Sequence, residues 1–298
     1  MKNLIKFRYF QIKQAIWLLR SVKNPISSFL YYINRKDHVT VKTRKIGSFS
    51  FDSTQHDLCH TLLAILPKLE NSNYEQCSHF YSQASNKNSI IELNDYKFVY
   101  DGCSAFAEIF AEYPYNFKSS PKDNIIIDIG ANVGDTALEF ANEGYVVYGF
   151  EPVKHLYEVS QKNLELNPNL KDKIHLFNYA VSYKRGHITI DSLDSTSYFI
   201  DSVDSYEVEV ITLDDIITNY NIKPTLLKID CEGCEFEIIE NSDLSIFNEI
   251  IMEQHAGYVN KNYLSLIDAL KKQGFDIELH TTRSYSADFV GIIHAYKK

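Results

Sequence analysis

Short apolar runs and amphipathic stretches alternate along the chain from residue 121 onward. The runs are rich in Ile and Val, as in strands buried on both faces, and the stretches between them have apolar residues at helical spacing. We expect strands at 125–129, 146–150, 174–178, 225–229, 248–254, 275–279 and 289–295, and helices at 134–143, 153–166, 213–220, 234–240 and 260–273. The alternation predicts an α/β fold, a doubly wound, seven-stranded and mostly parallel sheet of the Rossmann-like type, with an inserted hairpin at 187–190 and 207–211.

The first 120 residues lack this alternation and are expected to form a helical N-terminal extension. Residues 3–33 have few helix breakers before Pro25 and predict a basic amphipathic helix. Short helices are expected at 55–69 and 103–110, and a hairpin at 89–100. A turn-rich connector at 113–121 then divides the chain into two domains, residues 1–120 and residues 121–298.

Charge is distributed unevenly along the chain. The net charge is −9, but residues 1–45 hold 11 Lys and Arg and one acid, Asp37. This asymmetry indicates a basic arm before an acidic body, and the acidic body argues against nucleic-acid binding. The N-terminal helix could lie on anionic lipid, as a peripheral membrane contact of residues 1–45, or could pack on the protein or on a partner chain. No run is long enough to span a membrane and no cleavable signal is evident, so we expect a cytoplasmic protein, possibly peripheral at the membrane.

The five cysteines do not form an even, regularly spaced set. An odd, scattered set of cysteines does not predict a disulfide scaffold and favours a reducing compartment. Cys231 and Cys234 form a Cys-x-x-Cys pair around Gly233. A redox motif is one interpretation of this pair, and two small, half-buried residues at a glycine turn are the favoured one.

The chemistry-bearing motif follows the first expected strand. Gly130, Asn132 and Gly134 lie where a tight turn leads into a helix, and Glu151 ends the next strand, 21 residues after Gly130. This is the arrangement that holds a ribose-bearing cofactor, in which a carboxylate binds the ribose hydroxyls. A dinucleotide pyrophosphate requires glycine at the position of Asn132, so the motif favours S-adenosylmethionine (SAM) over NAD. The alternative is a plain strand-turn-helix in which the glycines serve packing only.

Other candidate site residues lie at strand ends, where ligands bind in such sheets. Asp128 could orient the turn or the SAM amino group, and Ala180 could border the adenine. His255 is the candidate general base, with Glu253 on the same side of an expected strand. Asp230 could orient His255. Asp230, Glu253 and His255 could also bind a divalent metal, but no metal is predicted.

Lys228 lies in an apolar strand and should therefore pair with a carboxylate. That acid could belong to the site, so that Lys228 sets its charge, or the two could form a structural ion pair.

Four motifs in order resemble the FkbM family of SAM-dependent methyltransferases: Asp128 to Gly134, Phe150-Glu-Pro152, Leu213-Asp-Asp215 and Lys228 to Gly233. The resemblance covers about residues 88–280. It implies a class I methyltransferase fold, with the last of seven strands antiparallel, and methyl transfer to a hydroxyl of a sugar, polyketide or other small molecule. Cys231 and Cys234 replace the Val and Ala that are usual in the family's last motif.

We therefore expect a SAM-dependent O-methyltransferase acting on a glycan, a lipid-linked sugar or another small molecule. Two alternatives stay open at this point. One is a non-catalytic module with a SAM fold that serves binding or assembly. The other is an NAD-dependent oxidoreductase, which Asn132 disfavours.

Overall fold

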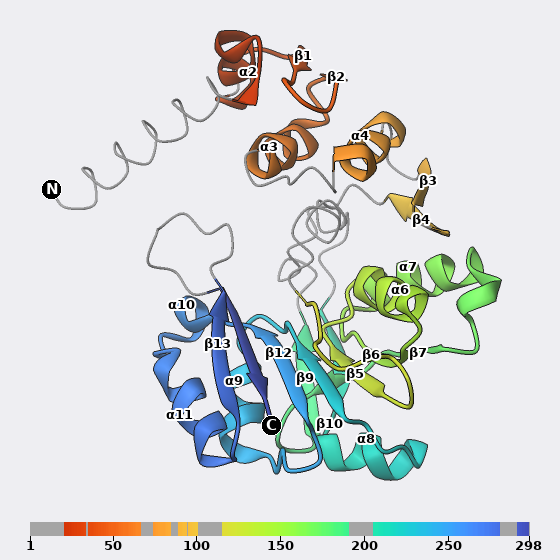
Figure 1. Ribbon diagram of the computed structural model, residues 1–298, viewed down its shortest axis with the longest axis vertical. Coiled ribbons are helices and arrows are strands. Elements are labelled where there is room, and N and C mark those ends of the chain that lie inside the picture. Colours follow the sequence, from red (N-terminus) through yellow and green to blue (C-terminus); the bar gives the residue numbers. More distant parts are fainter. Residues whose placement is uncertain are drawn as a thin grey trace, which may run out of the picture. The chain divides into compact units, whose positions relative to one another are not determined.

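A computed structural model describes residues 21–33, 35–66, 74–84, 89–93, 95–100, 115–190, 205–280 and 291–297 of the chain (Figure 1). The chain forms two compact units, which are described separately below. The first comprises residues 1–94 and 99–113, and the second comprises residues 95–98 and 114–298. The expected helix at 103–110 lies outside the described residues. The domain boundary near residue 121 stays a prediction.

The second unit contains the expected seven-stranded sheet, in the order β13-β14-β12-β11-β5-β6-β7. Its strands are β5 (Ile125–Ile129), β6 (Val146–Phe150), β7 (Ile174–Phe177), β11 (Leu226–Ile229), β12 (Glu249–Glu253), β13 (Asp276–His280) and β14 (Ile292–Tyr296). β14 pairs antiparallel with both of its neighbours, and the other pairings are parallel. The doubly wound class I methyltransferase fold is confirmed. The chain runs from β5 through β6 to β7 and then returns to β11, on the other side of β5. The strand order therefore reverses between β5 and β11, and ligands bind at such a point in these sheets.

Helices follow the strands as the periodicity predicts (Figure 1). They are α6 (Asp135–Glu143), α7 (Lys154–Glu165), η2 (Pro168–Leu170), α8 (Leu213–Tyr220), α9 (Glu235–Asn241), α10 (Ala256–Val259) and α11 (Leu264–Lys272). The helix expected at 260–273 is thus wrong at its start, because a short helix ends at Asn260, which adopts a left-handed conformation with φ 51°.

The two faces of the sheet differ in character. Ile127, Leu227 and Ile250 point to one face and pack with residues of α8, α9 and α11 in the main hydrophobic core. Asp128 and Lys228 are partners in register and therefore share the opposite face. That face holds the polar residues from which the site is built.

Residues 115–119 run along β12 on the polar face. The backbone N–H groups of Lys118 and Ser119 donate to the carboxylate of Glu249, at 2.6 and 3.0 Å, where β12 begins. Tyr115 lies at the other end of the strand, 3.4 Å from the carboxylate of Glu253. This segment thus brings an aromatic side chain to the carboxyl end of the sheet.

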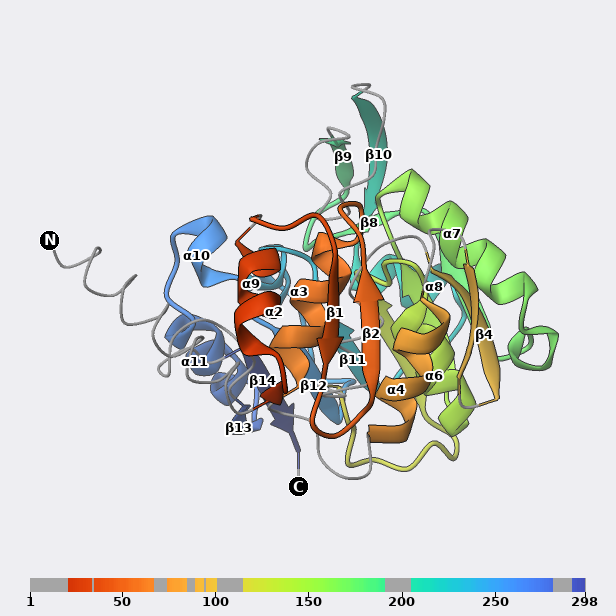
Figure 2. The same ribbon diagram turned by 90° about the horizontal axis from the view of Figure 1, so that it is seen from above.

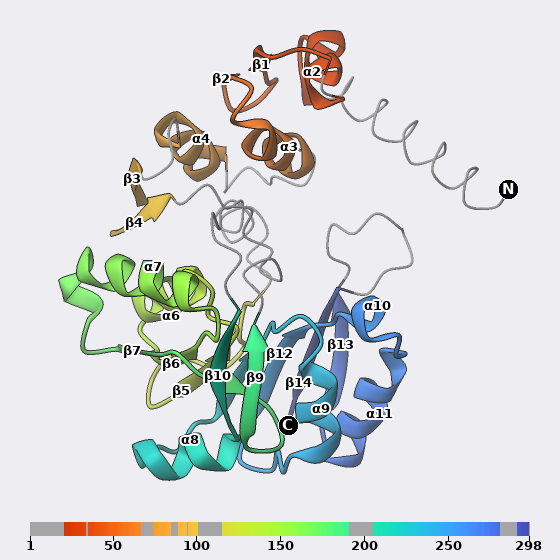
Figure 3. The same ribbon diagram turned by 180° about the vertical axis from the view of Figure 1, so that it is seen from behind.

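A separate three-stranded sheet, in the order β8-β10-β9, forms an arm on the second unit. β9 (Gly186–Ile190) and β10 (Tyr206–Ile211) pair antiparallel, as expected, and extend away from the seven-stranded sheet (Figures 2 and 3). β8 (Ala180–Val181), which the sequence analysis missed, pairs with the end of β10.

The first unit contains α2 (Pro25–Tyr32), β1 (Val39–Lys42), β2 (Ser48–Phe51), α3 (His56–Ile65), α4 (Tyr74–Gln83) and β3 (Ser89–Leu93), and β4 (Tyr96–Tyr100) pairs with β3. The continuous helix expected at 3–33 is wrong over its described part. Val22 bridges to Thr43, and Asn24 leaves the helical region with φ −126° and ψ 60° before Pro25 begins a new helix. A residue before proline is biased against helix, which explains the break. No helix among the described residues has the length and hydropathy needed to cross a membrane.

Candidate active site

The turn after β5 fits tightly against the end of β11. Gly130 has φ 78°, and a Cβ atom there would lie 1.8 Å from the carbonyl oxygen of Asp230. Only glycine can occupy this position, because both the backbone conformation and the contact exclude a side chain. The close contact joins the ends of β5 and β11, so the turn and Asp230 form one continuous surface.

Glu151 follows β6 and faces the same turn. Its two carboxylate oxygens accept the backbone N–H groups of Asn132 and Val153, each at 2.8 Å. A carboxylate has about four lone-pair sites, so acceptor capacity is left for a diol. Burial raises the pKa of Glu151 to about 7, although the two backbone donors oppose this shift. The Oδ1 atom of Asn132 is buried and has no hydrogen-bond partner among the residues that the structure describes.

Asp128 and Lys228 form a buried ion pair beneath the turn. Lys228 Nζ lies 2.9 Å from Asp128 Oδ1 and donates to the carbonyl oxygen of Gly130 at 2.7 Å. Thr136 Oγ1 donates to the other oxygen of Asp128 at 2.6 Å. Burial alone would lower the pKa of Lys228, but Asp128, Asp230 and Asp135 together outweigh burial and raise it. The acid that Lys228 meets is therefore Asp128, and Lys228 links this acid to the turn at Gly130.

Asp230 and Glu253 are brought together by Tyr115. The buried Tyr115 hydroxyl donates to Asp230 Oδ2 at 2.8 Å and lies 3.4 Å from Glu253 Oε2. Burial and the charges of Asp230 and Glu253 raise the pKa of Tyr115 well above its usual range, so it stays a proton donor. Two carboxylates thus share one neutral donor at the ends of β11 and β12.

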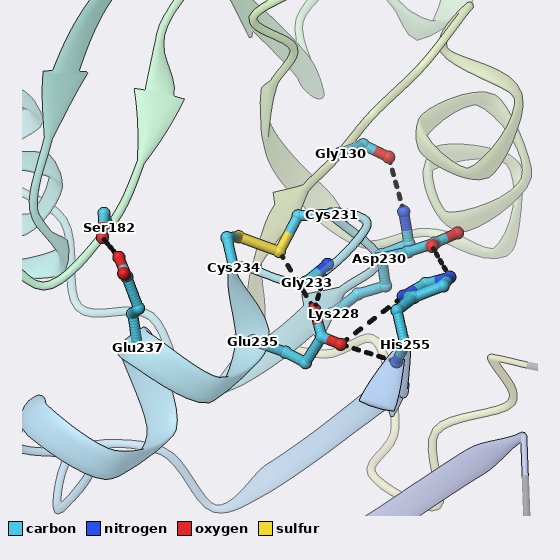
Figure 4. The surroundings of a disulfide bond; sticks show 10 residues. All are labelled: Gly130, Ser182, Lys228, Asp230, Cys231, Gly233, Cys234, Glu235, Glu237 and His255. Atoms are coloured by element: carbon cyan, nitrogen blue, oxygen red, sulfur yellow. Dashed lines mark hydrogen bonds and ion pairs between the residues drawn. A yellow bond between two sulfur atoms is a disulfide. The ribbon is translucent and has the colours of Figure 1, made fainter. Parts of the chain in front are cut away.

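His255 lies beside this pair but not on the strand. β12 ends at Glu253, so the expected strand at 248–254 is too long. His255 lies just before α10, and the alternation of side chains along a strand therefore does not determine which way His255 points. The Nε2 atom lies 3.8 Å from Asp230 Oδ1, and Nδ1 lies 3.6 Å from Glu235 Oε1 (Figure 4). Burial alone would lower the pKa of His255, but Glu235, Asp230 and Glu232 together raise it to about 9. At neutral pH the ring is therefore charged.

The geometry also bears on the metal considered for this site. Ligand atoms of Asp230, Glu253 and His255 all lie within 4.8 Å of one another. However, a protonated imidazole has no lone pair to give to a metal, and Tyr115 already uses one oxygen of Asp230. A metal would have to displace the proton of His255 in order to bind here, and we assign none.

Glu235 is a further buried carboxylate of the site. It accepts the backbone N–H groups of Gly233 at 2.8 Å and His255 at 2.6 Å (Figure 4). A disulfide joins Cys231 and Cys234 in the loop that carries Asp230 and Glu235 into α9. Both cysteines are half-buried at the glycine turn, as the favoured interpretation of the pair expected. The disulfide itself was not expected; it forms because the turn at Glu232 and Gly233, both with positive φ, brings the two side chains together.

Ala180 is not brought to the residues described above. It begins β8 and packs with Ile190, Val208 and Val210 in the small core of the arm. Its neighbour Asn178 instead donates its side-chain amide to the carbonyl oxygen of Glu151 at 2.8 Å. A contact of Ala180 with adenine stays a prediction.

A family model of the methyltransferase FkbM domain matches residues 128–277, half of the chain. The chain belongs to the FkbM methyltransferase family. The match begins at Asp128 of the glycine turn and includes Glu151, Lys228, Asp230 and His255. The family and the fold that the sequence motifs implied are thereby confirmed.

Several known methyltransferases are similar to this FkbM-family chain. The methyltransferase sdnD of Sordaria araneosa is 28% identical over an alignment of 183 residues, and the match covers 46% of this chain and 68% of that protein. The crystal structure of methyltransferase FkbM from Methylobacillus flagellatus KT has a TM-score of 0.46 and 15% identity, over 82% of this chain and 61% of that chain. Magnesium protoporphyrin IX methyltransferase (ChlM) from Synechocystis PCC 6803, solved with bound SAM, has a TM-score of 0.36 and 13% identity, over 65% of this chain and 77% of that chain. This chain thus spans less than two thirds of the length of the FkbM structure.

Two residues of the site were missed by the sequence analysis. Glu235 could have been found, since it ends the family's last motif, Lys228 to Glu235. Tyr115 could not, because it is one of 21 tyrosines and lies in a connector without periodicity. Its role depends on contacts with residues more than a hundred positions away.

Proposed function

We propose that this FkbM-family protein transfers the methyl group of SAM to a hydroxyl oxygen. The observation that carries the proposal is the contact between Gly130 and Asp230. This contact joins the two halves of the site, one for binding the ribose of SAM and one for acid–base chemistry. The first half consists of the turn and Glu151, and the second of Asp230, Glu253 and His255. A methyl donor and a proton acceptor are needed side by side for this reaction.

The residues of the first half fit SAM. Glu151 keeps lone pairs for a ribose diol, and the buried Oδ1 of Asn132 finds no partner in the described part of the chain. The side chain of Asn132 suits SAM, which has no pyrophosphate that must touch the backbone. When bound, SAM supplies an electrophilic methyl group on a positively charged sulfur. Glu151, Asn132 and the turn hold it, while Asp128 and Lys228 act beneath the turn as positioning residues.

His255 serves as the general base in its neutral form. With its remaining proton on Nδ1, facing Glu235, the Nε2 lone pair lies on the side of Asp230. An acceptor hydroxyl that enters between His255 and Asp230 would give its proton to Nε2. Bound SAM would supply the methyl group to that oxygen, and its sulfur would leave as the neutral thioether of S-adenosylhomocysteine. The carboxylates of Asp230 and Glu235 stabilise the imidazolium that results, and the Tyr115 hydroxyl keeps Asp230 in place beside Glu253.

A hydroxyl is the acceptor that such a site favours. It is a poor nucleophile unless a base removes its proton, and this site places a base beside several carboxylates. We propose a glycan, a lipid-linked sugar or another small molecule as the acceptor. The protein would then act in the cytoplasm, in peripheral contact with the membrane where the acceptor is lipid-linked.

Isotope-labelled SAM tests the proposal. The protein is incubated with methyl-labelled SAM and cell extracts, and the labelled product is identified. We expect a labelled ether on a hydroxyl, and no label with H255N although this variant still binds SAM in calorimetry. Binding of SAM without any labelled product would instead indicate a non-catalytic module, and binding of NAD without SAM would indicate an oxidoreductase.

Chelation tests the absence of a metal. Because no metal is assigned, treatment with EDTA should leave turnover unchanged. Loss of turnover that Mn²⁺ restores would show that Asp230, Glu253 and His255 act as ligands, and would remove His255 as the base.

A further inference from the structure

Within the part of the first unit that the structure describes, α2 packs through one face. Ser28 and Tyr31 are fully buried on this face. The Tyr31 hydroxyl donates to the backbone carbonyl of Asp52, and its ring stacks on His56 with centroids 4.2 Å apart. α2 also packs against β1, as Figure 2 shows. These contacts fix which side of the helix points outward.

The outward side of α2 is apolar. Ile26, Phe29, Leu30 and Ile33 are 76%, 36%, 36% and 42% exposed. They are spaced i, i+3, i+4 and i+7, so they form one stripe along the helix. We call these four residues the apolar stripe. An apolar stripe that faces away from its own core marks a surface that meets a partner.

Basic residues lie at both ends of the apolar stripe. At the start of α2, Lys23 N–H donates to the Lys42 carbonyl at 2.6 Å, and Lys42 N–H donates to the side chain of Asn24 at 2.8 Å. At the end, Arg35 N–H donates to the Leu30 carbonyl at 2.8 Å. The side chains of Lys23, Lys42 and Arg35 are exposed, as is that of Lys36, which donates to Ser27 at 2.9 Å. Asp37 is the one acid among the first 45 residues.

We infer that the apolar stripe and these basic residues form a docking surface for an anionic lipid bilayer. An apolar helix face with cations around it is the pattern of an interfacial helix, in which apolar side chains enter the headgroup region and Lys and Arg bind lipid phosphates. Residues 46–298 are acidic, so an anionic bilayer repels them and attracts the basic first 45 residues, to which this surface belongs. The surface lies on α2, whereas the sequence analysis looked for it on one long N-terminal helix.

The surface complements the proposed function without depending on it. A bilayer-bound enzyme would meet a lipid-linked acceptor directly, but vesicle binding requires no methyl transfer. Failure to bind vesicles would therefore leave the methyltransferase proposal intact, and failure to methylate would leave the docking surface intact.

Vesicle co-sedimentation of the full chain tests the inference. We compare phosphatidylcholine vesicles with vesicles that contain phosphatidylserine. Wild-type protein should sediment with the anionic vesicles only, and added salt should weaken the binding. The variant I26S/F29S/L30S/I33S should bind at least about tenfold more weakly. The variant K23Q/R35Q/K36Q/K42Q should lose the preference for anionic lipid.

A matched control removes apolar residues that are exposed elsewhere. Ile188, Ile246 and Leu264 are 42%, 42% and 50% exposed in the second unit. The variant I188S/I246S/L264S should bind vesicles like the wild type, and circular dichroism checks that each variant is folded. The inference is wrong if the stripe variant is folded and binds like the wild type. It is also wrong if the wild type binds no vesicles but forms a dimer that the stripe variant loses.

Discussion

Tyr115 donates its hydroxyl to Asp230 and approaches Glu253, although Tyr115 precedes Asp230 by 115 positions and Glu253 by 138. The hydroxyl is the neutral group between two carboxylates that would otherwise repel each other. Tyr115 therefore acts as a positioning residue for Asp230, which in turn faces the ring of His255.

Replacing Tyr115 tests this relationship. Y115F removes the hydroxyl and keeps the ring, so we expect kcat/KM to fall about tenfold while the free energy of unfolding falls by only about 1 kcal/mol. Y145F is the matched control, because the Tyr145 hydroxyl donates to the carbonyl of Ser119 and not to Asp230 or Glu253. Equal losses of activity in the two variants would mean that Tyr115 has only a structural role.

The pH dependence of turnover should report His255. Its pKa of about 9 leaves about 1% of the ring neutral at pH 7, so kcat/KM should rise about tenfold per pH unit and level off above pH 9. The positive sulfur of bound SAM disfavours the imidazolium, so the pKa seen in kcat should be lower than that seen in kcat/KM. A profile that is flat between pH 7 and 9 would contradict the assignment of His255 as the base.

Stability should depend on the same titration. The folded-state pKa of His255 is raised from the usual 6.5 to about 9, so its charged form stabilises the fold fully below pH 6.5, and this stabilisation is lost as pH rises through 9. The difference is at most about 3 kcal/mol. H255N should lack this decrease, as measured by urea unfolding at pH 6 and pH 9.5.

Glu151 should have two separable effects. E151Q removes the negative charge offered to the ribose, so SAM should bind about tenfold more weakly in calorimetry. The folded-state pKa of Glu151 is raised from 4.5 to about 7. The contribution of Glu151 to the free energy of unfolding is therefore fully present below pH 4.5 and is lost as pH rises through 7. E151Q should not show this loss. E237Q is the control, since Glu237 is exposed on α9. SAM binding by E151Q that equals that of the wild type would contradict a ribose contact.

Lys228 and Asp128 should be coupled in stability. K228M leaves the carboxylate of Asp128 buried without its cation, which should lower the free energy of unfolding by about 3–5 kcal/mol. The double variant D128N/K228M should recover part of that loss, as measured by a double-mutant cycle. Unchanged turnover in folded K228M would show that Lys228 has no effect on the site.

The sequence by itself determined the seven strands of the main sheet, their order along the chain and the glycine turn. Apolar runs such as Ile125 to Ile129 specify buried strands locally, and Gly130 is required wherever a turn must touch another backbone. Glu151 and Asp230 could be predicted as strand-end residues for the same reason. The need of Lys228 for a carboxylate also followed from its apolar neighbours.

Only the tertiary structure decided which groups meet. It paired Lys228 with Asp128, brought Tyr115 to Asp230, and surrounded His255 with carboxylates that keep it charged at neutral pH. It also showed that α2 starts anew at Pro25 and turns Ile26 and Ile33 outward. Periodicity reports which face of an element is buried, whereas a partner, a distance and a pKa depend on residues far away in the sequence, which local patterns do not encode.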